Sequence, residues 1–266
     1  MSRTFKNPPL VELTAELRWG GSRPQGTHWA GMTQDEAKAH FESEDLFNHF
    51  GIAAASCGYT RVERLLPVGV PANPSQTVYR YKSLDDDAKS VVFQIGSGVL
   101  TINASQPYKS WQAFEPRVVQ AITMLAQAFA AVGRSEPVFD AVVVRYIDAF
   151  GEEMTEGRAP MEFISEVLGC KIELPKSLSS VCTDPAGLMP KLQFQGPIDG
   201  GMLSLTLAHG LVNKAPAVVL DMATVVPCPH GADADGAVRA LRKARQVLHD
   251  IFIGMTEKLV PIMKPE

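Results

Sequence analysis

The segment from Gln76 to Gly133 constrains the fold more than any other part of this 266-residue sequence. Its first half alternates apolar and polar residues in three short stretches, at 77–81, 90–95 and 99–103. The last two stretches flank the turn Gly96-Ser97-Gly98. Alternation on both sides of a glycine turn is typical of a β-hairpin, so this half predicts antiparallel strands.

The second half of the segment has the period of an amphipathic helix. Apolar side chains recur every three or four residues, at Phe114, Val118, Ile122, Leu125, Phe129 and Val132. This spacing places them on one face of a helix. Proline is tolerated in a first turn, so Pro116 predicts a regular helix from about Glu115, after a turn at 110–114. Gly133 then ends the helix, and its apolar face is expected to pack on the preceding strands.

The rest of the chain repeats this order of elements. Leu10 to Trp19 alternates like a half-buried strand, and Asp35 to Ala55 reads as a helix. Val138 to Phe150, rich in β-branched and aromatic residues, begins the second series. It continues with the following elements: a short helix at 160–168, strands at 192–195 and 203–208 around Asp199-Gly200-Gly201, a strand at 217–226, and a last helix capped by Asp233 or Asp235.

This order predicts an α+β fold of two similar halves. Each half would be an antiparallel sheet backed by a long C-terminal helix, with the order β-α-βββ-α. We expect the halves at residues 1–133 and 134–266, either as separate sheets or as one continuous domain. A parallel α/β fold is disfavoured because helices do not follow the strands one for one.

Composition excludes several classes of protein. The net charge of −4 makes nucleic-acid binding unlikely, because neutralising phosphates needs a basic surface. The four cysteines are dispersed, without zinc-site spacing or the density of a disulfide scaffold. No apolar run approaches the roughly 20 residues that cross a bilayer, and the N-terminus lacks the apolar core of a signal peptide. We therefore expect a cytoplasmic protein with no membrane partner.

The common catalytic motifs are absent from the sequence. We find no phosphate-binding glycine loop, no Gly-x-Ser-x-Gly and no His-Glu-x-x-His. Asp148, Glu152 and Glu153 follow a strong strand and could hold a divalent cation, although solvated acidic loops account for them better. The sequence therefore predicts no catalytic residues, no metal ligands and no cofactor.

The candidate binding residues gather near the first strand. Arg18, Trp19, His28 and Trp29 surround a loop-like stretch, and an exposed Trp beside Arg is typical of a binding hot spot. Buried packing of one or both Trp side chains explains the pattern better. On the last helix, a basic stripe could meet an acidic partner, but a solvated outer face explains it better; it contains Arg239, Arg242, Lys243 and Arg245.

Four segments resemble a sporadically distributed family of bacterial proteins of uncharacterised function. They are the opening Phe5-Lys-Asn-Pro-Pro-Leu-Val-Glu with Glu16-Leu-Arg18, then Tyr79-Arg-Tyr-Lys-Ser83, then Tyr108 with Trp111 and Phe114, and finally Arg145-Tyr146-Ile147. The resemblance implies an accessory role in a defence, toxin-immunity or similar conflict locus. The resemblance assigns no role to a numbered residue. Arg145 is a further candidate binding residue, and this chain has Asp148 where the family pattern leads us to expect Asn.

Together these observations predict a non-enzymatic binding protein that acts through a protein partner or as a homodimer. The alternative is a sensor of a small nucleotide-like ligand, or a metal-dependent hydrolase, with its site between the two halves.

Overall fold

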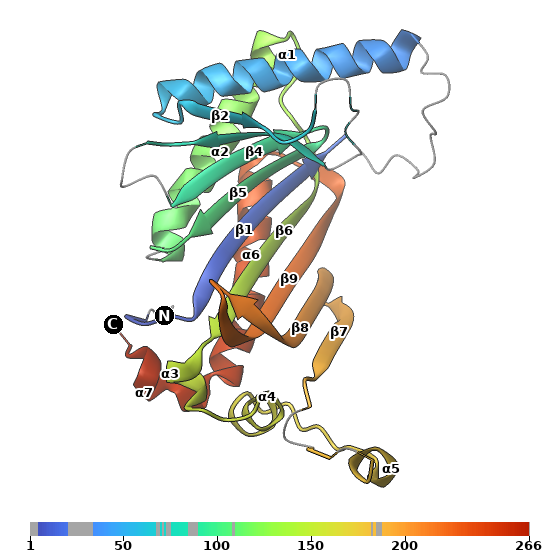
Figure 1. The fold of residues 1–266 in the computed structure, drawn as a ribbon. Helices are drawn as coiled ribbons and strands as arrows, with labels where there is room; N and C mark the ends of the chain where they lie inside the picture. The colour runs from blue at the N-terminus through green and yellow to red at the C-terminus, as the bar shows by residue number, and fades with distance from the viewer. Residues whose placement is uncertain are drawn as a thin grey trace. The chain divides into compact units, whose positions relative to one another are not determined.

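The computed structural model describes residues 5–20, 34–67, 70, 72, 76–84, 90–107, 110–181, 183–184 and 188–265 (Figure 1). Within these ranges, side-chain surroundings are defined for all residues except 34–43 and 178–179. The predicted turn at Asp85-Asp86-Asp87 lies outside the described residues.

The strands form one nine-stranded antiparallel sheet in the order β2-β3-β4-β5-β1-β6-β9-β8-β7 (Figure 1). Their bounds are β1 Leu10–Trp19, β2 Arg61–Arg64, β3 Thr77–Lys82, β4 Val91–Gly96, β5 Val99–Ser105, β6 Phe139–Phe150, β7 Lys191–Ile198, β8 Gly201–Val212 and β9 Ala215–Ala232. The predicted α+β class and antiparallel pairing are confirmed.

Three helices, α6, η3 and α7, follow the last strand in the chain, and the other described helices lie between strands. The long ones are α1 Gln34–Ser56, α2 Trp111–Ala131 and α6 Ala234–Met255. The short ones are α3 Glu152–Thr155, α4 Pro160–Glu162, the π-helix η1 Phe163–Val167, α5 Lys176–Ser179, the 3-10 helix η3 Glu257–Leu259 and α7 Val260–Met263. No helix in the described ranges is long and apolar enough to cross a membrane.

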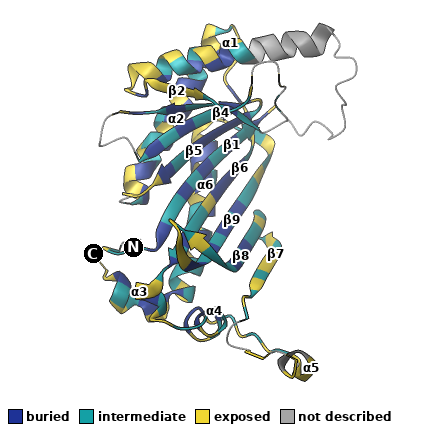
Figure 2. Ribbon diagram, viewed as in Figure 1, coloured by how far each residue is buried: buried dark blue, intermediate teal, exposed yellow. Residues whose placement is uncertain are grey.

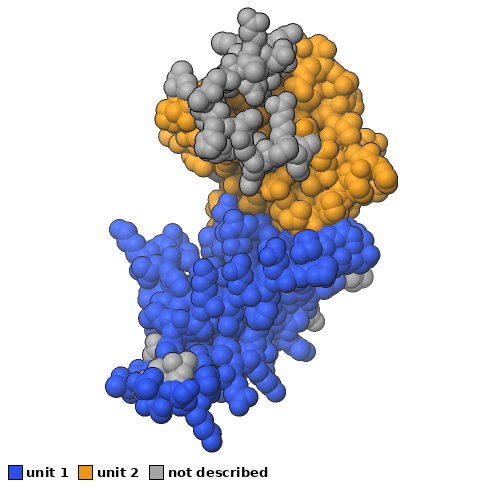
Figure 3. All heavy atoms as spheres, turned by 90° about the vertical axis from the view of Figure 1, so that its right-hand side faces the viewer, with its two compact units in different colours: residues 1–13, 145–224, 243–266 blue, residues 14–144, 225–242 orange. Residues whose placement is uncertain are grey.

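Contacts divide the chain into two compact units, coloured in Figure 3. Unit 1 comprises Met1–Leu13, Arg145–Thr224 and Lys243–Glu266, and unit 2 comprises Thr14–Val144 and Val225–Arg242. Each unit is therefore built from segments that are far apart in the sequence. The elements β1, β6, β9 and α6 each contribute residues to both units.

In unit 2, α1 and α2 pack on each other and on the strands β3 to β5. The buried side chains of the sheet include Tyr81, Phe93 and Ile95. Tyr81 packs against Phe50 of α1, with ring centroids 5.4 Å apart, and its hydroxyl donates to the Phe47 carbonyl at 2.8 Å. The sequence period of α2 predicts this packing of its apolar face on the strands.

Helix α2 begins at Trp111, one turn earlier than Pro116 suggests. The Ser110 side chain accepts a hydrogen bond from the Ala113 N–H at 3.3 Å and caps the helix. Trp111 and Phe114 are buried in this first turn. Capping and burial therefore outweigh the hydrogen bond that Pro116 cannot donate inside the helix.

The first predicted hairpin is confirmed as β4 and β5, joined at Ser97-Gly98. Gly98 has a φ of +74°, and a Cβ at this position would lie 2.7 Å from the Trp19 carbonyl oxygen. The Trp19 N–H donates to the Gly98 carbonyl at 3.0 Å. A glycine is thus required both by the turn and by the close approach of β1.

In unit 1, the second predicted hairpin is confirmed as β7 and β8, but both strands are longer than their alternation indicates. Leu205 and Leu207 of β8 are buried, and Phe150 packs near Phe163 of η1 with ring centroids 5.4 Å apart. Strand β9 extends over 18 residues, well beyond the predicted 217–226. In unit 2, Asp233 is the one of the two predicted caps for α6 that is used, since its Oδ1 accepts from the Gly236 N–H at 2.7 Å.

Candidate functional site

Two of the predicted binding residues lie at the end of β1 in unit 2. Trp19 is buried and packs edge-on against Phe129 and Phe139, with ring centroids 5.9 and 6.4 Å away. Trp19 thus has the buried packing that the sequence favours for one or both Trp side chains. Arg18 is half exposed and donates from Nε to Glu16 Oε1 at 2.5 Å. His28 and Trp29 lie outside the described residues.

The fifth predicted residue, Arg145, belongs to β6 in unit 1. Its guanidinium forms a two-pronged pair with Asp221 of β9, at 2.8 and 2.5 Å. These hydrogen bonds raise the pKa of Arg145, although burial acts in the opposite direction. The pair is half exposed, so it fixes neighbouring strands to each other and leaves part of the guanidinium open to solvent.

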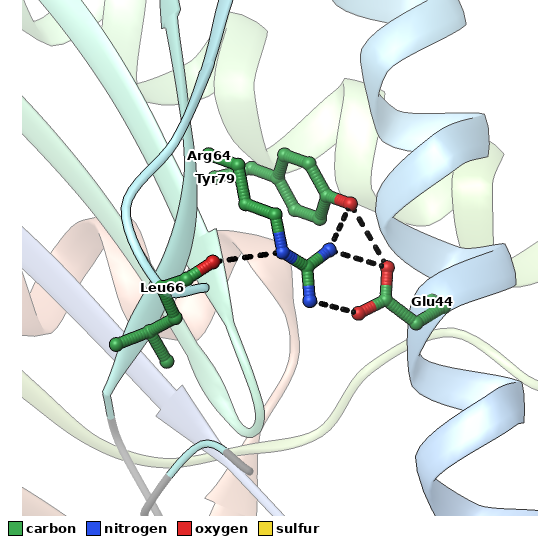
Figure 4. Close-up of polar contacts among 4 residues, drawn as sticks. All are labelled: Glu44, Arg64, Leu66 and Tyr79. Carbon is green, nitrogen blue, oxygen red and sulfur yellow. Dashed lines mark hydrogen bonds and ion pairs between the residues drawn. The ribbon is translucent and has the colours of Figure 1, made fainter. Parts of the chain in front are cut away.

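A polar cluster that sequence analysis missed joins α1, β2 and β3 in unit 2 (Figure 4). Arg64 donates to both carboxylate oxygens of Glu44, at 2.9 and 3.1 Å, and to the carbonyl of Leu66 at 2.8 Å. Arg64 also donates to the Tyr79 hydroxyl, which in turn donates to Glu44 at 2.9 Å. The Arg64 Cζ lies 4.9 Å from the centre of the Tyr79 ring.

The electrostatics of this cluster favour a structural role. Burial, followed by the hydrogen bond with Glu44, raises the pKa of Tyr79, so its hydroxyl stays protonated. The hydrogen bonds with Glu44 raise the pKa of Arg64, so its guanidinium stays protonated. A charged pair with a neutral phenol supplies neither a general base nor a nucleophile near neutral pH. We interpret the cluster as a tie between α1 and the edge of the sheet.

The basic stripe of α6 is partly neutralised by acidic residues. Arg242 donates to both oxygens of Glu115, at 2.5 and 3.0 Å, and Trp111 Nε1 donates to the same carboxylate at 2.7 Å. The hydrogen bonds from Arg242 lower the pKa of Glu115. In unit 1, Lys243 contacts Asp199 at 2.8 Å. These pairs agree with the interpretation of a solvated face.

The acidic residues at the end of β6 and just after it are not brought together as a cation site. Asp148 is buried and only 3% exposed, whereas Glu152 and Glu153 are exposed. Among the described residues, no three His, Cys, Asp or Glu side chains are grouped so as to hold a metal ion. Burial raises the pKa of Asp148 to about 8, and its Oδ2 has no hydrogen-bond partner.

A shallow hollow on unit 1 is lined by side chains of mixed charge. It is bordered by Ser165, Glu166, Lys171, Ile172, Glu173 and Lys258. Lys258 donates to the backbone carbonyl of Glu166 at 2.5 Å, which fixes one of the two cations to the protein. Equal numbers of lysine and glutamate leave the hollow without a preference for anionic or cationic ligands. The predicted small-ligand site between the halves stays a prediction.

The clearest candidate surface is the edge of the sheet at β7. In the described part of unit 1, every exposed large hydrophobic side chain falls between residues 181 and 211: Val181, Met189, Phe194, Met202 and Leu211. Phe194, in the middle of β7, is 51% exposed. Most of β7 is coloured as exposed or intermediate in Figure 2. Edge strands with exposed apolar side chains are templates for pairing with another strand.

The opposite edge of the sheet, β2, has the features that prevent such pairing. It has four residues, three of which are charged: Arg61, Glu63 and Arg64. Glu63 contacts Lys82 of β3 at 3.3 Å. Strand β7 has eight residues and one charge, Lys191. A short charged edge resists strand addition, whereas a long neutral one permits it.

No protein-family model matches this chain, and no curated protein matches it. Two solved structures resemble it weakly. A rolling circle replication initiator protein from Geobacillus stearothermophilus is 9% identical, with 91% of this chain and 80% of that chain covered and a TM-score of 0.22. The di-domain ARO/CYC StfQ from the steffimycin biosynthetic pathway is also 9% identical, with 94% and 99% covered and a TM-score of 0.20. Similarity this low indicates nothing about activity.

Proposed function

We propose that this chain is a non-enzymatic interaction protein that binds a protein partner by strand addition at β7. The observation that supports the proposal is a long, nearly uncharged edge strand with a half-exposed Phe194 at its centre. In strand addition, backbone hydrogen bonds supply affinity and alternate side chains supply specificity. Phe194 would be the principal anchor, since aromatic side chains dominate interface energetics.

The biological role in this proposal is inferred from the resemblance to a sporadically distributed bacterial family. We infer an accessory or immunity-type component of a strain-specific defence or conflict locus, acting in the cytoplasm. We also infer that the two halves are copies of one β-α-βββ-α unit, with β2 as an additional edge strand in the first half. Support comes from the sheet order, in which β2-β3-β4-β5-β1 and β7-β8-β9-β6 both run from a sheet edge inward to the first strand of their half.

The proposal is tested by capture from the native host with matched edge variants. Phe194→Lys places a charge in the middle of β7, and Val62→Lys places the same charge on β2 at a side chain that is 53% exposed. We expect wild type and Val62→Lys to retain a stoichiometric protein partner, either a different protein or the untagged native copy of this chain, and Phe194→Lys to lose it. A partner retained equally by all three proteins would contradict the role of β7.

A further inference from the structure

We propose that the partner of β7 is a second copy of this chain, and that two β7 strands pair antiparallel to form a homodimer. This inference rests on the proposed function, because it names the partner of the same edge. The sheet would then continue from one copy into the other through a two-fold axis at Phe194.

Most outward-facing backbone groups of β7 can bond to another strand, but Pro197 has no N–H to donate to it. A proline in an edge strand fits where its nitrogen faces away from the neighbouring strand, because it cannot donate to the ladder. Pro197 lies opposite Met202 of β8, so its nitrogen is inferred to face outward. Residues two positions apart share this orientation in an antiparallel ladder, so the N–H groups of Gln193 and Gln195 also face outward.

The sequence of β7 is complementary to itself in this register. With Phe194 opposite Phe194 of the second copy, each Gln193 lies opposite a Gln195, and each Leu192 lies opposite a Gly196. Outward-facing glutamines would exchange backbone hydrogen bonds, and their side-chain amides can bond across the strands. A large leucine opposite a glycine leaves room for the two neighbouring Phe194 rings.

The charges of β7 are also compatible with self-pairing. Lys191 lies opposite Pro197 in this register, so the two Lys191 side chains lie at opposite ends of the pair, about 20 Å apart. Self-pairing of β2 would instead place Arg61 opposite Arg64. Because only β7 pairs with itself without facing like charges, the assembly closes as a dimer and does not extend into a filament.

The interface is small, so the dimer should depend on concentration. One strand pair centred on Phe194 lies at the low end of specific interface areas, below about 1,200 Å². We expect dissociation in the micromolar range, detectable by sedimentation velocity across a dilution series of the full chain.

Complementary charge variants test the pairing directly. One variant carries Gln193→Lys and Gln195→Lys, and the other carries Gln193→Glu and Gln195→Glu. Each variant alone faces like charges with its own copy, so its dissociation constant should rise at least about tenfold. A one-to-one mixture faces opposite charges and should dimerise at least as well as wild type. Dimerisation that is unchanged in the lone variants, or a mixture that stays monomeric, would overturn the proposal.

A cysteine placed at the two-fold axis tests the register. In a background with the four native cysteines replaced by serine, Phe194→Cys should form an intermolecular disulfide under mild oxidation. Residues that do not exchange hydrogen bonds across antiparallel strands have Cα atoms about 4.5 Å apart, within disulfide range. Leu192→Cys faces Gly196 and should stay reduced. Equal cross-linking of both variants would contradict this register.

The homodimer and the proposed function can fail separately. Wild type that is monomeric at every concentration, together with a host protein whose capture Phe194→Lys abolishes, would overturn the homodimer and leave strand addition standing. Monomeric wild type with no partner lost from Phe194→Lys would overturn both.

Discussion

The buried Asp148 carboxyl lowers the free energy of unfolding by an amount that depends on pH. Its carboxyl is 3% exposed, Oδ2 has no hydrogen-bond partner, and burial raises its pKa from 3.8 to about 8. Between those two values the folded chain holds a proton that the unfolded chain releases. The free energy of unfolding therefore falls as pH rises through this window, by up to about 1.4 kcal/mol per pH unit, and the loss is complete above pH 8.

We predict that Asp148→Asn stabilises the protein at pH 8.5 and has a smaller effect at pH 5. Asparagine has nearly the same shape but no charge to desolvate, so it removes the cost that grows with pH. The gain in the free energy of unfolding should be larger at pH 8.5 by about 2 kcal/mol or more. Urea unfolding of both proteins at the two pH values measures this difference, and equal gains would show that the carboxyl is not protonated in the folded chain.

We predict that Arg64→Lys destabilises unit 2 by about 1–2 kcal/mol, because an ammonium cannot replace the two-pronged contact with Glu44 and the bond to Leu66. Arg80→Lys is the matched control on the next strand, since Arg80 contacts Glu63 through a single 3.5 Å interaction. The control should change stability by less than about 0.5 kcal/mol. The denaturant midpoints of the two variants measure the two changes in stability. Similar losses of stability would argue against a specific contact between α1 and the sheet through Arg64.

At the scale of elements, the turn between β4 and β5 is constrained by β1. We predict that Gly98→Ala lowers stability by about 2–3 kcal/mol, since the new Cβ meets both an unfavourable φ and the Trp19 carbonyl oxygen. Gly133→Ala is the matched control, because Gly133 also has a positive φ, of +70°, but no heavy atom lies within 4 Å of its Cβ position. It should cost about 1 kcal/mol. Thermal unfolding of both variants separates the cost of the positive φ from the cost of the contact with Trp19. Equal losses of stability would show that the contact with β1 has no effect.

Elements with one buried face were predictable from the sequence, and elements shaped by distant contacts were not. The alternation of Leu10 to Trp19 matches the bounds of β1, because each second side chain is buried from Leu13 to Trp19. Strands β7 and β9 were predicted too short, since they include Gly, Pro and polar residues that pairing with β8 keeps extended. In the polar cluster, Tyr79 lies 35 positions from Glu44 in the sequence, and Arg64 lies 20 positions from it. Local sequence patterns do not predict contacts over such separations.

At the scale of the whole molecule, the two units divide the chain differently from a cut at residue 133. Strand β1 lies between β5 and β6 in the sheet, a long-range pairing that the order of elements leaves open. Unit 2 takes in Val225–Arg242 from the end of the chain. Trp19 packs on Phe139, and Glu115 binds Arg242, so unit 2 depends on residues from both predicted halves.

We therefore predict that fragments 1–133 and 134–266 do not fold separately but reconstitute the native structure when combined. The first fragment lacks Phe139 and Arg242 and would expose the apolar side of Trp19. The amide NMR signals of each fragment alone should lack the chemical-shift dispersion of a folded domain. An equimolar mixture should recover the NMR spectrum of the intact chain. If residues 1–133 alone gave a dispersed spectrum and a cooperative thermal transition, that half would be an independent domain, and the contributions of 134–144 and 225–242 to its core would be dispensable.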